Sequence, residues 1–446
     1  MSTLPENFLL RARKFTGAKY DDFIESLSQT PPVSIRINPF KRENFFSAEE
    51  KIPWSMEGKY LKKRPPFTFD PLFHAGCYYV QDASSQFIEQ AFLQIKKDLN
   101  KPIRVLDLCA APGGKSTHLL SMLEDNDLLV CNEIIGSRNN ILRQNIMKWG
   151  KENVFVTQND PADFNRLEGF FDIIVVDAPC SGEGLFRKDE ASRSEWSEEN
   201  IQRCTIRQEE ILKNAYSTLR PGGFFIYCTC TFENDENDNQ IKSLCNKFDL
   251  EVQQINNNFS GIVKTESGLT FFPHLIRGEG FYISLLKKKD GNVIPVKKVN
   301  DNNDNSFKKN LVRFLNNPDK YTALLKDDRL FAIPVLHLNA LNTLNRNLYV
   351  RLAGIYMGDF KGEDFIPSAA LALSINLKDD LSSRELTEKE SIEYLKGGNL
   401  QIDMSKGWSI VKHKTFGLGW VKNIGSRINN YYPKEWRIKK QNGVKE

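Results

Sequence analysis

The chain of 446 residues has no long run of apolar residues. A membrane-spanning helix needs about 20 of them in succession, so we expect no transmembrane segment. The first residues, Met1 to Glu6, also lack the basic and then apolar pattern of a secretory signal peptide. We therefore expect a cytoplasmic protein that makes no contact with a membrane.

Cysteine and histidine are present, but in no metal-binding arrangement. There is no Cys-x-x-Cys pair, and none of the five histidines stands at a spacing from cysteine that suits zinc. In a reducing cytoplasm cysteines stay thiols, and most of them pack as small buried hydrophobic residues. We predict no metal site. The eight cysteines lie at positions 77, 109, 131, 180, 204, 228, 230 and 245.

The chain also lacks a strong charge of either sign, since its net charge is only +4. This balance excludes little, because a basic face can lie on a nearly neutral protein. The length corresponds to roughly two to four domains with sizeable cores.

The stretch from Arg104 to Ser116 organises the chain. Its apolar start, residues 105–108, predicts a strand that is buried on both faces. The Pro-Gly-Gly sequence at 112–114 predicts a tight turn, and residues 115–123 have apolar residues at helical spacing. A strand, a glycine turn and a helix open nucleotide-cofactor folds, which bind their ligand at the C-terminal edge of the strand.

Three alternatives compete with this interpretation. Gly114, Lys115 and Ser116 match the end of a P-loop, but that motif needs glycine where this chain has Cys109. A dinucleotide-binding loop needs Gly-x-Gly-x-x-Gly, which is absent. The third alternative is an ordinary turn without a ligand, and the residues at later strand ends argue against it.

Residues 1–100 form a mixed α/β leader. Helices are expected at 7–14 and 20–27, and the alternation of residues 31–39 predicts a half-exposed strand that carries Arg36 and Asn38. The basic run Lys62-Lys63-Arg64 is a candidate phosphate contact, with a solvated loop as the equal alternative.

Residues 101–288 alternate strand-like and helical segments, which predicts a mostly parallel sheet. In such a sheet the C-terminal ends of the strands line the ligand crevice. Four carboxylates in register there, with thiols at the last two strand ends, indicate a functional site. The end residues are Asp107, Glu133, Asp160, Asp177 and Cys230.

A polar segment at 289–306 is a predicted linker. Beyond it, residues 307–446 form a second region with helical and strand-like pieces. Its end, residues 416–433, interleaves aromatic, glycine and basic residues, which suits a small β-rich module that contacts RNA. The alternative is a plain β-domain whose aromatic residues form its core.

Cys180 and Cys230 follow two adjacent predicted strands. Cysteine is the strongest side-chain nucleophile near neutral pH. Two thiols that face a cofactor indicate either a disulfide or a covalent addition in which they divide the work. A structural disulfide is disfavoured in the cytoplasm.

Three motifs carry a resemblance to a known family. Residues 105–115 (VLDLCAAPGGK), 177–182 (DAPCSG) and 229–231 (TCT) resemble the signature motifs of the Sun-type (NSUN-like) RNA cytosine-5 methyltransferases. Residues 34–39, 79–85 and 272–281 are similar to further family segments. The layout most resembles that of the bacterial RsmF group, which acts on small-subunit (16S) ribosomal RNA.

The resemblance implies an α/β fold. A Rossmann-like class I methyltransferase domain would occupy 101–288, after an α/β N-terminal RNA-binding extension at 1–100. The linker at 289–306 would lead to a small PUA-like, β-rich RNA-binding region at 307–446. The resemblance also implies the cofactor S-adenosylmethionine and a monomeric protein that acts on rRNA without a metal.

The resemblance assigns roles to individual residues. Glu133 would take the ribose hydroxyls, Asp160 would approach the adenine, and Asp177 would lie beside the methyl-donor region. Cys230 would be the nucleophile and Cys180 its helper. Cys228 stands where many relatives have serine and, on the same face as Cys230, would support it. The methionine and ribose would be wrapped by Cys109, Ala110, Ala111, Pro112, Gly113, Gly114 and Lys115.

The implied reaction is transfer of a methyl group to C5 of cytosine in RNA through a covalent Cys230–C6 intermediate. DNA cytosine-5 methyltransferases offer a rival assignment, in which the Pro-Cys thiol attacks and Cys180 is the nucleophile. Other functions left open are methylation of tRNA or another RNA, methylation of a protein or small molecule, and a cofactor-binding RNA chaperone without turnover.

Overall fold

The computed structural model describes residues 4–43, 46–99, 101–289 and 306–439. Most of the predicted linker therefore lies outside the described residues. The centre of the molecule is a ten-stranded sheet in the order β11-β12-β13-β9-β8-β5-β6-β7-β16, with β10 paired to β13. Its parallel core consists of β5 (Arg104–Asp107), β6 (Leu128–Asn132), β7 (Val154–Thr157), β8 (Phe171–Asp177) and β9 (Leu219–Thr229).

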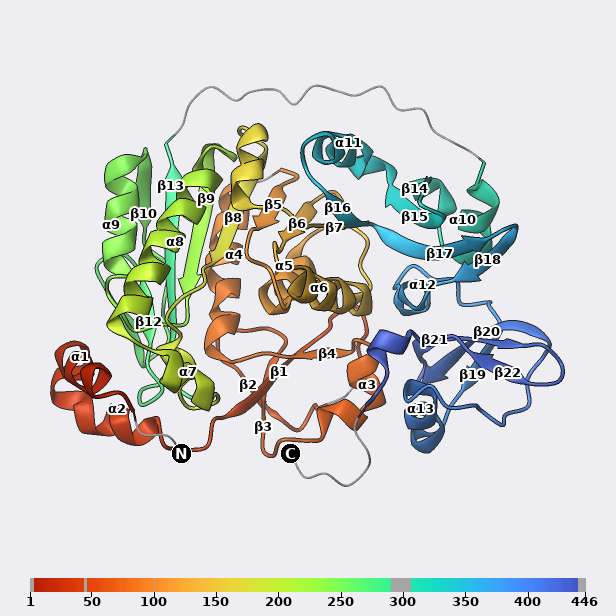
Figure 1. Cartoon of the computed structure of the whole chain (residues 1–446), viewed down its shortest axis with the longest axis horizontal. Coiled ribbons are helices and arrows are strands. Elements are labelled where there is room, and N and C mark those ends of the chain that lie inside the picture. Colours follow the sequence, from red (N-terminus) through yellow and green to blue (C-terminus); the bar gives the residue numbers. More distant parts are fainter. Residues whose placement is uncertain (1–3, 44–45, 100, 290–305, 440–446) are drawn as a thin grey trace.

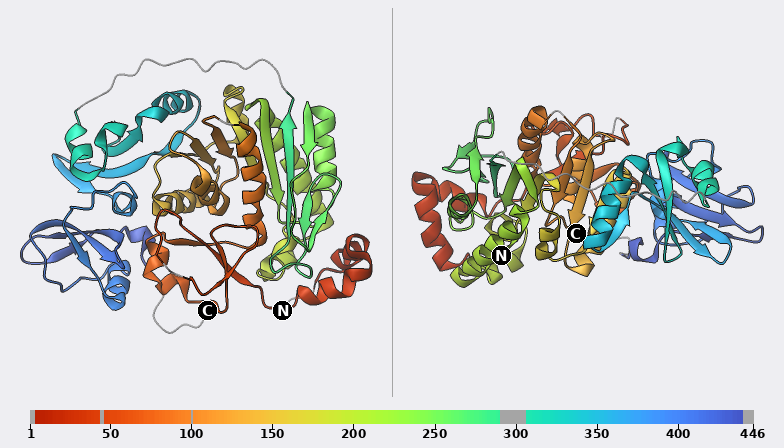
Figure 2. Two further views of the ribbon diagram at one scale, coloured as in Figure 1. Left: turned by 180° about the vertical axis from the view of Figure 1, so that it is seen from behind. Right: turned by 90° about the horizontal axis from the view of Figure 1, so that it is seen from above.

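The parallel core forms because its strands are short apolar runs that helices cover. Leu106, Val130 and Ile174 are fully buried, as expected for strands covered on both faces. The two views in Figures 1 and 2 place α8 and α4 on opposite faces of this sheet. The helices of this part are α4 (Ile88–Leu99), α5 (Gly114–Met122), α6 (Gly136–Trp149), α7 (Glu190–Glu195), α8 (Glu198–Tyr216) and α9 (Asp238–Lys247).

Both edges of the sheet are antiparallel, which the sequence did not indicate. On one side β13 (Phe281–Lys288) pairs with β9 and is followed by β12 (Leu269–Phe271) and β11 (Ile262–Lys264), while β10 (Leu250–Gln253) also pairs with β13. On the other side β16 (Val350–Ala353), from the C-terminal region, pairs with β7. This pairing covers the backbone groups of β7, which would otherwise form an open edge.

The leader contains α1 (Glu6–Thr16), α2 (Tyr20–Ser26) and α3 (Pro71–His74). Its antiparallel sheet has the order β2-β3-β1-β4, with β1 at Val33–Ile37, β2 at Glu50–Lys51, β3 at Gly58–Leu61 and β4 at Tyr78–Val80. The half-exposed strand predicted here is wrong, because Arg36 and Asn38 are both 0% exposed.

Hydrogen bonds explain why polar residues of β1 are buried. The Arg36 guanidinium donates to Gln81 Oε1 at 2.8 Å and to Thr117 Oγ1 at 2.6 Å, and it lies 4.5 Å from the centre of the Trp149 ring. It also donates to the carbonyl of Gly114 at 3.2 Å. The leader therefore holds the glycine turn and the start of α5 in place.

The C-terminal region builds two further four-stranded sheets (Figure 1). The first contains β14 (Tyr321–Lys326), β15 (Arg329–Pro334), β17 (Ile355–Lys361) and β18 (Asp364–Pro367). The second contains β19 (Ser383–Glu385), β20 (Gly407–His413), β21 (Phe416–Asn423) and β22 (Ile428–Asn430). Their helices are α10 (Lys308–Phe314), α11 (Leu338–Asn347), α12 (Ala369–Leu373) and α13 (Glu388–Leu395).

Part of the aromatic end of the chain belongs to the core of the second small sheet. Trp420 and Tyr432 are each only 2% exposed, which agrees with the plain β-domain alternative for these two side chains. Among the described residues, no helix is both long enough and apolar enough to span a bilayer.

Candidate active site

A cavity of about 310 Å³ opens at the C-terminal edge of the parallel strands. Residues from the ends of all five of these strands line it. They meet because the C-terminal ends of parallel strands lie at the same edge of the sheet. Of the predicted site residues, those that line the cavity are Cys109, Ala111, Glu133, Asp160, Asp177, Cys180 and Cys230.

The other predicted cofactor residues shape the turn and do not line the cavity themselves. They are Ala110, Pro112, Gly113, Gly114 and Lys115. Gly113 has a φ of 110°, which favours glycine, and α5 begins at the next residue. Lys115 forms a partly buried ion pair, with its Nζ 2.7 Å from Asp177 Oδ2. Burial lowers the pKa of Lys115, but the Asp177 carboxylate, together with Cys228 and Cys230, raises it above its ordinary value.

Asp107 lies beneath the cavity and is completely buried. Its Oδ2 accepts a hydrogen bond from Ser116 Oγ at 2.6 Å, whereas its Oδ1 has no partner among the described residues. Burial raises the pKa of Asp107 to about 7; the Ser116 bond opposes the shift and Asp177 adds to it. This carboxyl group therefore changes its charge near neutral pH.

The carboxylates on the cavity wall fit the chemistry of S-adenosylmethionine. Glu133 accepts from the Ile135 N–H at 2.9 Å and lies 3.5 Å from the Arg138 guanidinium, so its side chain is held at the end of β6. Asp160 accepts from the Ala162 N–H at 2.9 Å. Carboxylates accept hydrogen bonds from ribose hydroxyls and attract a sulfonium cation.

The two thiols of the cavity touch each other. Cys180 Sγ lies 3.1 Å from Cys230 Sγ, and the Cys230 N–H donates to Cys180 Sγ at 3.3 Å. Both cysteines are free thiols. The hydrogen bond with Cys230 and then burial raise the pKa of Cys180 well above its ordinary value. Cys180 therefore keeps its proton at neutral pH.

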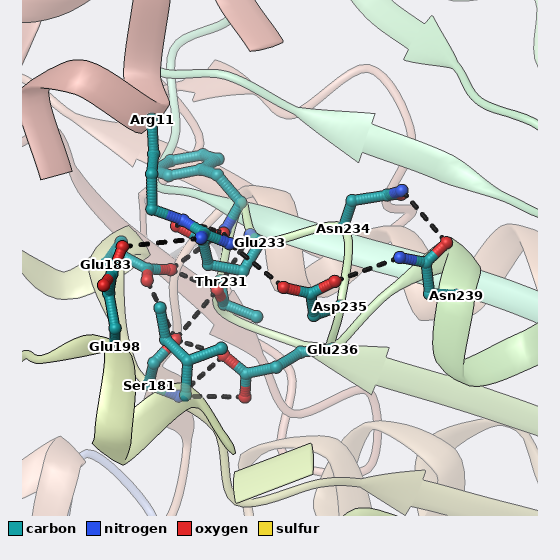
Figure 3. Close-up of polar contacts among 12 residues, drawn as sticks. Arg11, Ser181, Glu183, Glu198, Thr231, Glu233, Asn234, Asp235, Glu236 and Asn239 are labelled. Carbon is teal, nitrogen blue, oxygen red and sulfur yellow. Dashed lines mark hydrogen bonds and ion pairs between the residues drawn. The ribbon is translucent and has the colours of Figure 1, made fainter. Parts of the chain in front are cut away.

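Two buried glutamates, which the sequence did not single out, join the two cysteine loops (Figure 3). Glu236 accepts from the Ser181 N–H at 3.1 Å and from Gln208 Nε2 at 2.7 Å, and it also bonds the Ser181 hydroxyl. Glu183 accepts from Ser181 Oγ at 2.9 Å and bonds the Thr231 hydroxyl. Ser181 follows Cys180 and Thr231 follows Cys230, so this network fixes both sulfur atoms.

Burial changes the ionisation of both glutamates. It raises the pKa of Glu236 to about 7, with Glu183 as the next cause. It raises the pKa of Glu183 to about 6, with Glu233 as the next cause. The sequence signal for this pair was weak, because an acidic residue after a motif is usually solvated. The two glutamates come together at Ser181 only when the chain folds.

The leader also reaches this loop. Arg11 of α1 donates through Nε to Glu233 Oε1 at 2.9 Å and through Nη2 to Asp235 Oδ2 at 3.1 Å (Figure 3). Other cavity residues that sequence reasoning missed come mainly from α6 and α8, namely Asn132, Arg138, Arg207, Glu210 and Asn214.

The Rossmann-like sheet with carboxylates at its C-terminal edge is typical of the class of S-adenosylmethionine-dependent methyltransferases. Family models match along the chain: the N-terminal domain of 16S rRNA methyltransferase RsmF at residues 4–83, 16S rRNA methyltransferase RsmB/F at 94–287, and the methyltransferase RsmF PUA domain at 382–438. The chain is therefore an S-adenosylmethionine-dependent RNA methyltransferase of the RsmB/F family. The predicted family, fold class and cofactor are confirmed.

Relatives and solved structures agree with this assignment. Ribosomal RNA small subunit methyltransferase F of Aliivibrio salmonicida is 28% identical over 97% of both chains. The Escherichia coli O127:H6 protein of the same name is 29% identical over 97% of this chain and 96% of its own.

Two solved structures from Pyrococcus horikoshii share the fold over 64% of this chain. A methyltransferase homologue matches over 95% of its own chain with a TM-score of 0.54 and 25% identity. NSun6, determined with the S-adenosylmethionine analogue SFG, matches over 99% of its chain with a TM-score of 0.53 and 18% identity.

Proposed function

We propose that this protein methylates C5 of a cytosine in small-subunit (16S) ribosomal RNA through a covalent bond between Cys230 and C6 of the base. The observation that carries the proposal is the contact of Cys180 and Cys230, 3.1 Å apart, at the wall of the carboxylate-lined cavity. The relatives named small subunit methyltransferase F, which match 97% of the chain, support ribosomal RNA as the substrate.

The cofactor would supply the methyl group. Cys109 to Lys115 would surround its methionine and ribose, and Glu133 would accept hydrogen bonds from the ribose hydroxyls. Asp160 would approach the adenine, and Asp177, anchored by Lys115, would lie beside the methyl-donor region. The resemblance to the family suggests these roles, and the presence of all three carboxylates on the cavity wall supports them.

The two thiols would divide the remaining chemistry. C5 of cytosine is a weak nucleophile, so the Cys230 thiolate would add to C6 and shift the double-bond electrons to C5. After the methyl group is gained, a base removes the C5 proton and the S–C6 bond breaks, which restores the ring and the Cys230 thiolate. Cys180, whose raised pKa keeps it protonated, suits the role of helper in this release rather than that of the attacking thiolate.

The remaining parts of the chain would hold the RNA. We propose that the extension at 1–100 and the region at 307–446, beyond the linker at 289–306, bind rRNA beside the methyltransferase domain at 101–288. The target cytosine would have to be unpaired or flipped out to reach the cavity. The protein would act as a cytoplasmic monomer, without a membrane or a metal.

Adduct trapping tests the assignment of the thiols. With 16S rRNA and S-adenosylmethionine, the Cys180→Ala protein is expected to accumulate an adduct that survives a denaturing gel. Cys230→Ala should form none, and Cys245→Ala, which removes a half-buried thiol outside the cavity, should turn over like the wild type. An adduct with Cys230→Ala but not with Cys180→Ala would reverse the roles.

Bisulfite sequencing tests the substrate. Incubation of the wild-type protein with 16S rRNA and with bulk tRNA is expected to produce 5-methylcytosine in the former. If only tRNA is methylated, the proposal of a ribosomal RNA substrate is wrong and the alternative of another RNA holds. No methylation of either would leave a protein or small-molecule substrate.

A further inference from the structure

A second cavity, of about 570 Å³, lies between α6 and the C-terminal region. Its basic side chains are Arg143 of α6, Arg329 of β15 and Arg351 of β16. Because β16 is part of the central sheet, the C-terminal region holds these cations at a fixed position beside the catalytic domain. Aromatic and apolar side chains complete the wall, among them Ile141 of α6, Phe331 of β15, Tyr356 of β17 and Trp436 near the C-terminus.

Among the described residues, Arg143 and Arg351 have no carboxylate partner, and Arg329 has only a long ion pair with Asp359. Arg143 Nε is buried and has no hydrogen-bond partner among the described residues. Burial, followed by repulsion from Arg351 and Arg329, lowers the pKa of Arg143. Two acids also line the cavity, but Arg329 Nε lies 4.0 Å from the nearer one, Asp359, and Glu435 is exposed. A cavity that gathers guanidinium groups in this way is complementary to an anion such as phosphate.

Hydrogen bonds lead from the active-site wall to Tyr349, which lies beside this cavity next to Arg351. Ile134, on the active-site wall, accepts through its carbonyl from Gln158 Nε2 at 3.3 Å, and the Gln158 N–H donates to the carbonyl of Tyr349 at 3.0 Å. Tyr349 is 52% exposed, and the guanidinium of Arg351 lies 5.4 Å from the centre of its ring. Ile134, just before α6, and Ile141, on α6, are 41% and 49% exposed and extend this surface.

We propose that this cavity is a binding site for the RNA strand next to the target cytosine. Phosphate groups would be held by Arg143, Arg329 and Arg351, and an unpaired base would stack on Tyr349. The inference rests on the proposed function, since it assumes that RNA enters the first cavity. Stacking on an exposed aromatic ring beside cations is typical of single-stranded RNA binding.

Removal of two of the cations tests the site. The Arg143→Gln/Arg351→Gln protein is expected to bind a single-stranded 16S rRNA fragment about 10-fold to 100-fold more weakly at 100 mM salt. The slope of log K against log salt should fall by about 1.4, or about 0.7 for each lost phosphate contact. Affinity for S-adenosylmethionine should not change. Lys97→Gln, which removes an exposed positive charge on α4, is the matched control and should bind RNA like the wild type.

A second variant keeps the test valid if the double variant fails to fold. Tyr349→Ala changes an exposed side chain, and it is expected to raise KM for RNA about 10-fold with little change in kcat. Wild-type affinity and salt dependence in both variants would overturn the inference. So would a loss confined to assembled small subunits, because it would indicate contact with a ribosomal protein.

The test separates the two proposals. If the wild-type protein methylates 16S rRNA and the arginine variant binds that RNA equally well, only this inference fails. If the wild-type protein binds RNA through the arginines yet forms no 5-methylcytosine, the proposed function fails and the RNA site stands.

Discussion

Cys180 and Cys230 are chemically identical but have different surroundings. The sulfur of Cys180 accepts the Cys230 N–H and contacts the other thiol, and the residue after it is held by Glu236. A positioned thiol pair needs such supports, because small displacements of reacting groups cost large factors in rate. At the scale of single residues, the buried glutamates are therefore as informative as the cysteines.

Because the pKa of Glu236 is raised, we expect the stability of the protein to depend on pH. Its pKa is about 7 in the folded protein against an ordinary 4.5, so the folded state binds more protons between these values. The contribution of the protonated group to stability is complete below about pH 4.5 and is lost as the pH rises through 7. We expect Glu236→Gln to flatten the fall in the free energy of unfolding between pH 5 and 8 by about 2 to 3 kcal/mol.

Urea unfolding at several pH values measures this difference. Glu251→Gln, a change at an exposed carboxylate on β10, should leave the pH dependence of the wild type intact. Parallel curves for the wild type and Glu236→Gln would show that this carboxyl group titrates normally.

At the scale of elements, strand β1 of the leader positions helix α5 of the catalytic domain. Arg36 donates hydrogen bonds to the carbonyls of Gly114 and Thr117, both in the first turn of α5. The alternation of residues 31–39 predicts a half-exposed strand, because alternating polar residues usually face water. Here the polar face of the strand is covered by the helix that its arginine holds.

Arg36→Gln tests this coupling between elements. The shorter side chain leaves buried acceptors on α5 unpaired, so the free energy of unfolding should fall by about 2 to 4 kcal/mol. Affinity for S-adenosylmethionine, measured by titration calorimetry, should fall with it because α5 begins at the glycine turn. Arg166→Gln, at an exposed arginine, should change stability by less than about 0.5 kcal/mol. Unchanged stability in Arg36→Gln would contradict the role of Arg36 in holding α5.

At the scale of the whole molecule, the C-terminal region is part of the catalytic sheet. β16 covers the edge of β7, and Leu352 stands opposite Val156 in that pair. The chain therefore does not separate into a catalytic half and an independent RNA-binding half. An open β7 would be a template for pairing with other chains.

Leu352→Asp tests this closure of the sheet. Leu352 is 4% exposed, so a buried carboxylate there should lower the free energy of unfolding by about 3 kcal/mol or more. Hydrogen exchange of the β7 amides, Val154–Thr157, should become faster in the same variant. Val312→Asp makes a similar change at a side chain that is 44% exposed, and it should have little effect. Slow exchange of β7 in Leu352→Asp would show that the edge is stable without β16.

The parallel core, the strand-end carboxylates and the cysteine pair can be predicted from the amino-acid sequence alone. These features depend on residues that are close together in the chain, such as the glycine turn after Asp107, where apolar periodicity and turn-forming residues act locally. The shared edge of a parallel sheet then placed Asp177 and Cys230 in one cavity.

The burial of Arg36, the hydrogen bond between Ser181 and Glu236, and the proximity of Arg143 to Arg351 arise only when the chain folds. Each joins residues that are far apart in the chain. No local periodicity encodes which distant partner a polar side chain will find, because the energy of a buried polar group depends on the hydrogen bonds that the folded chain provides.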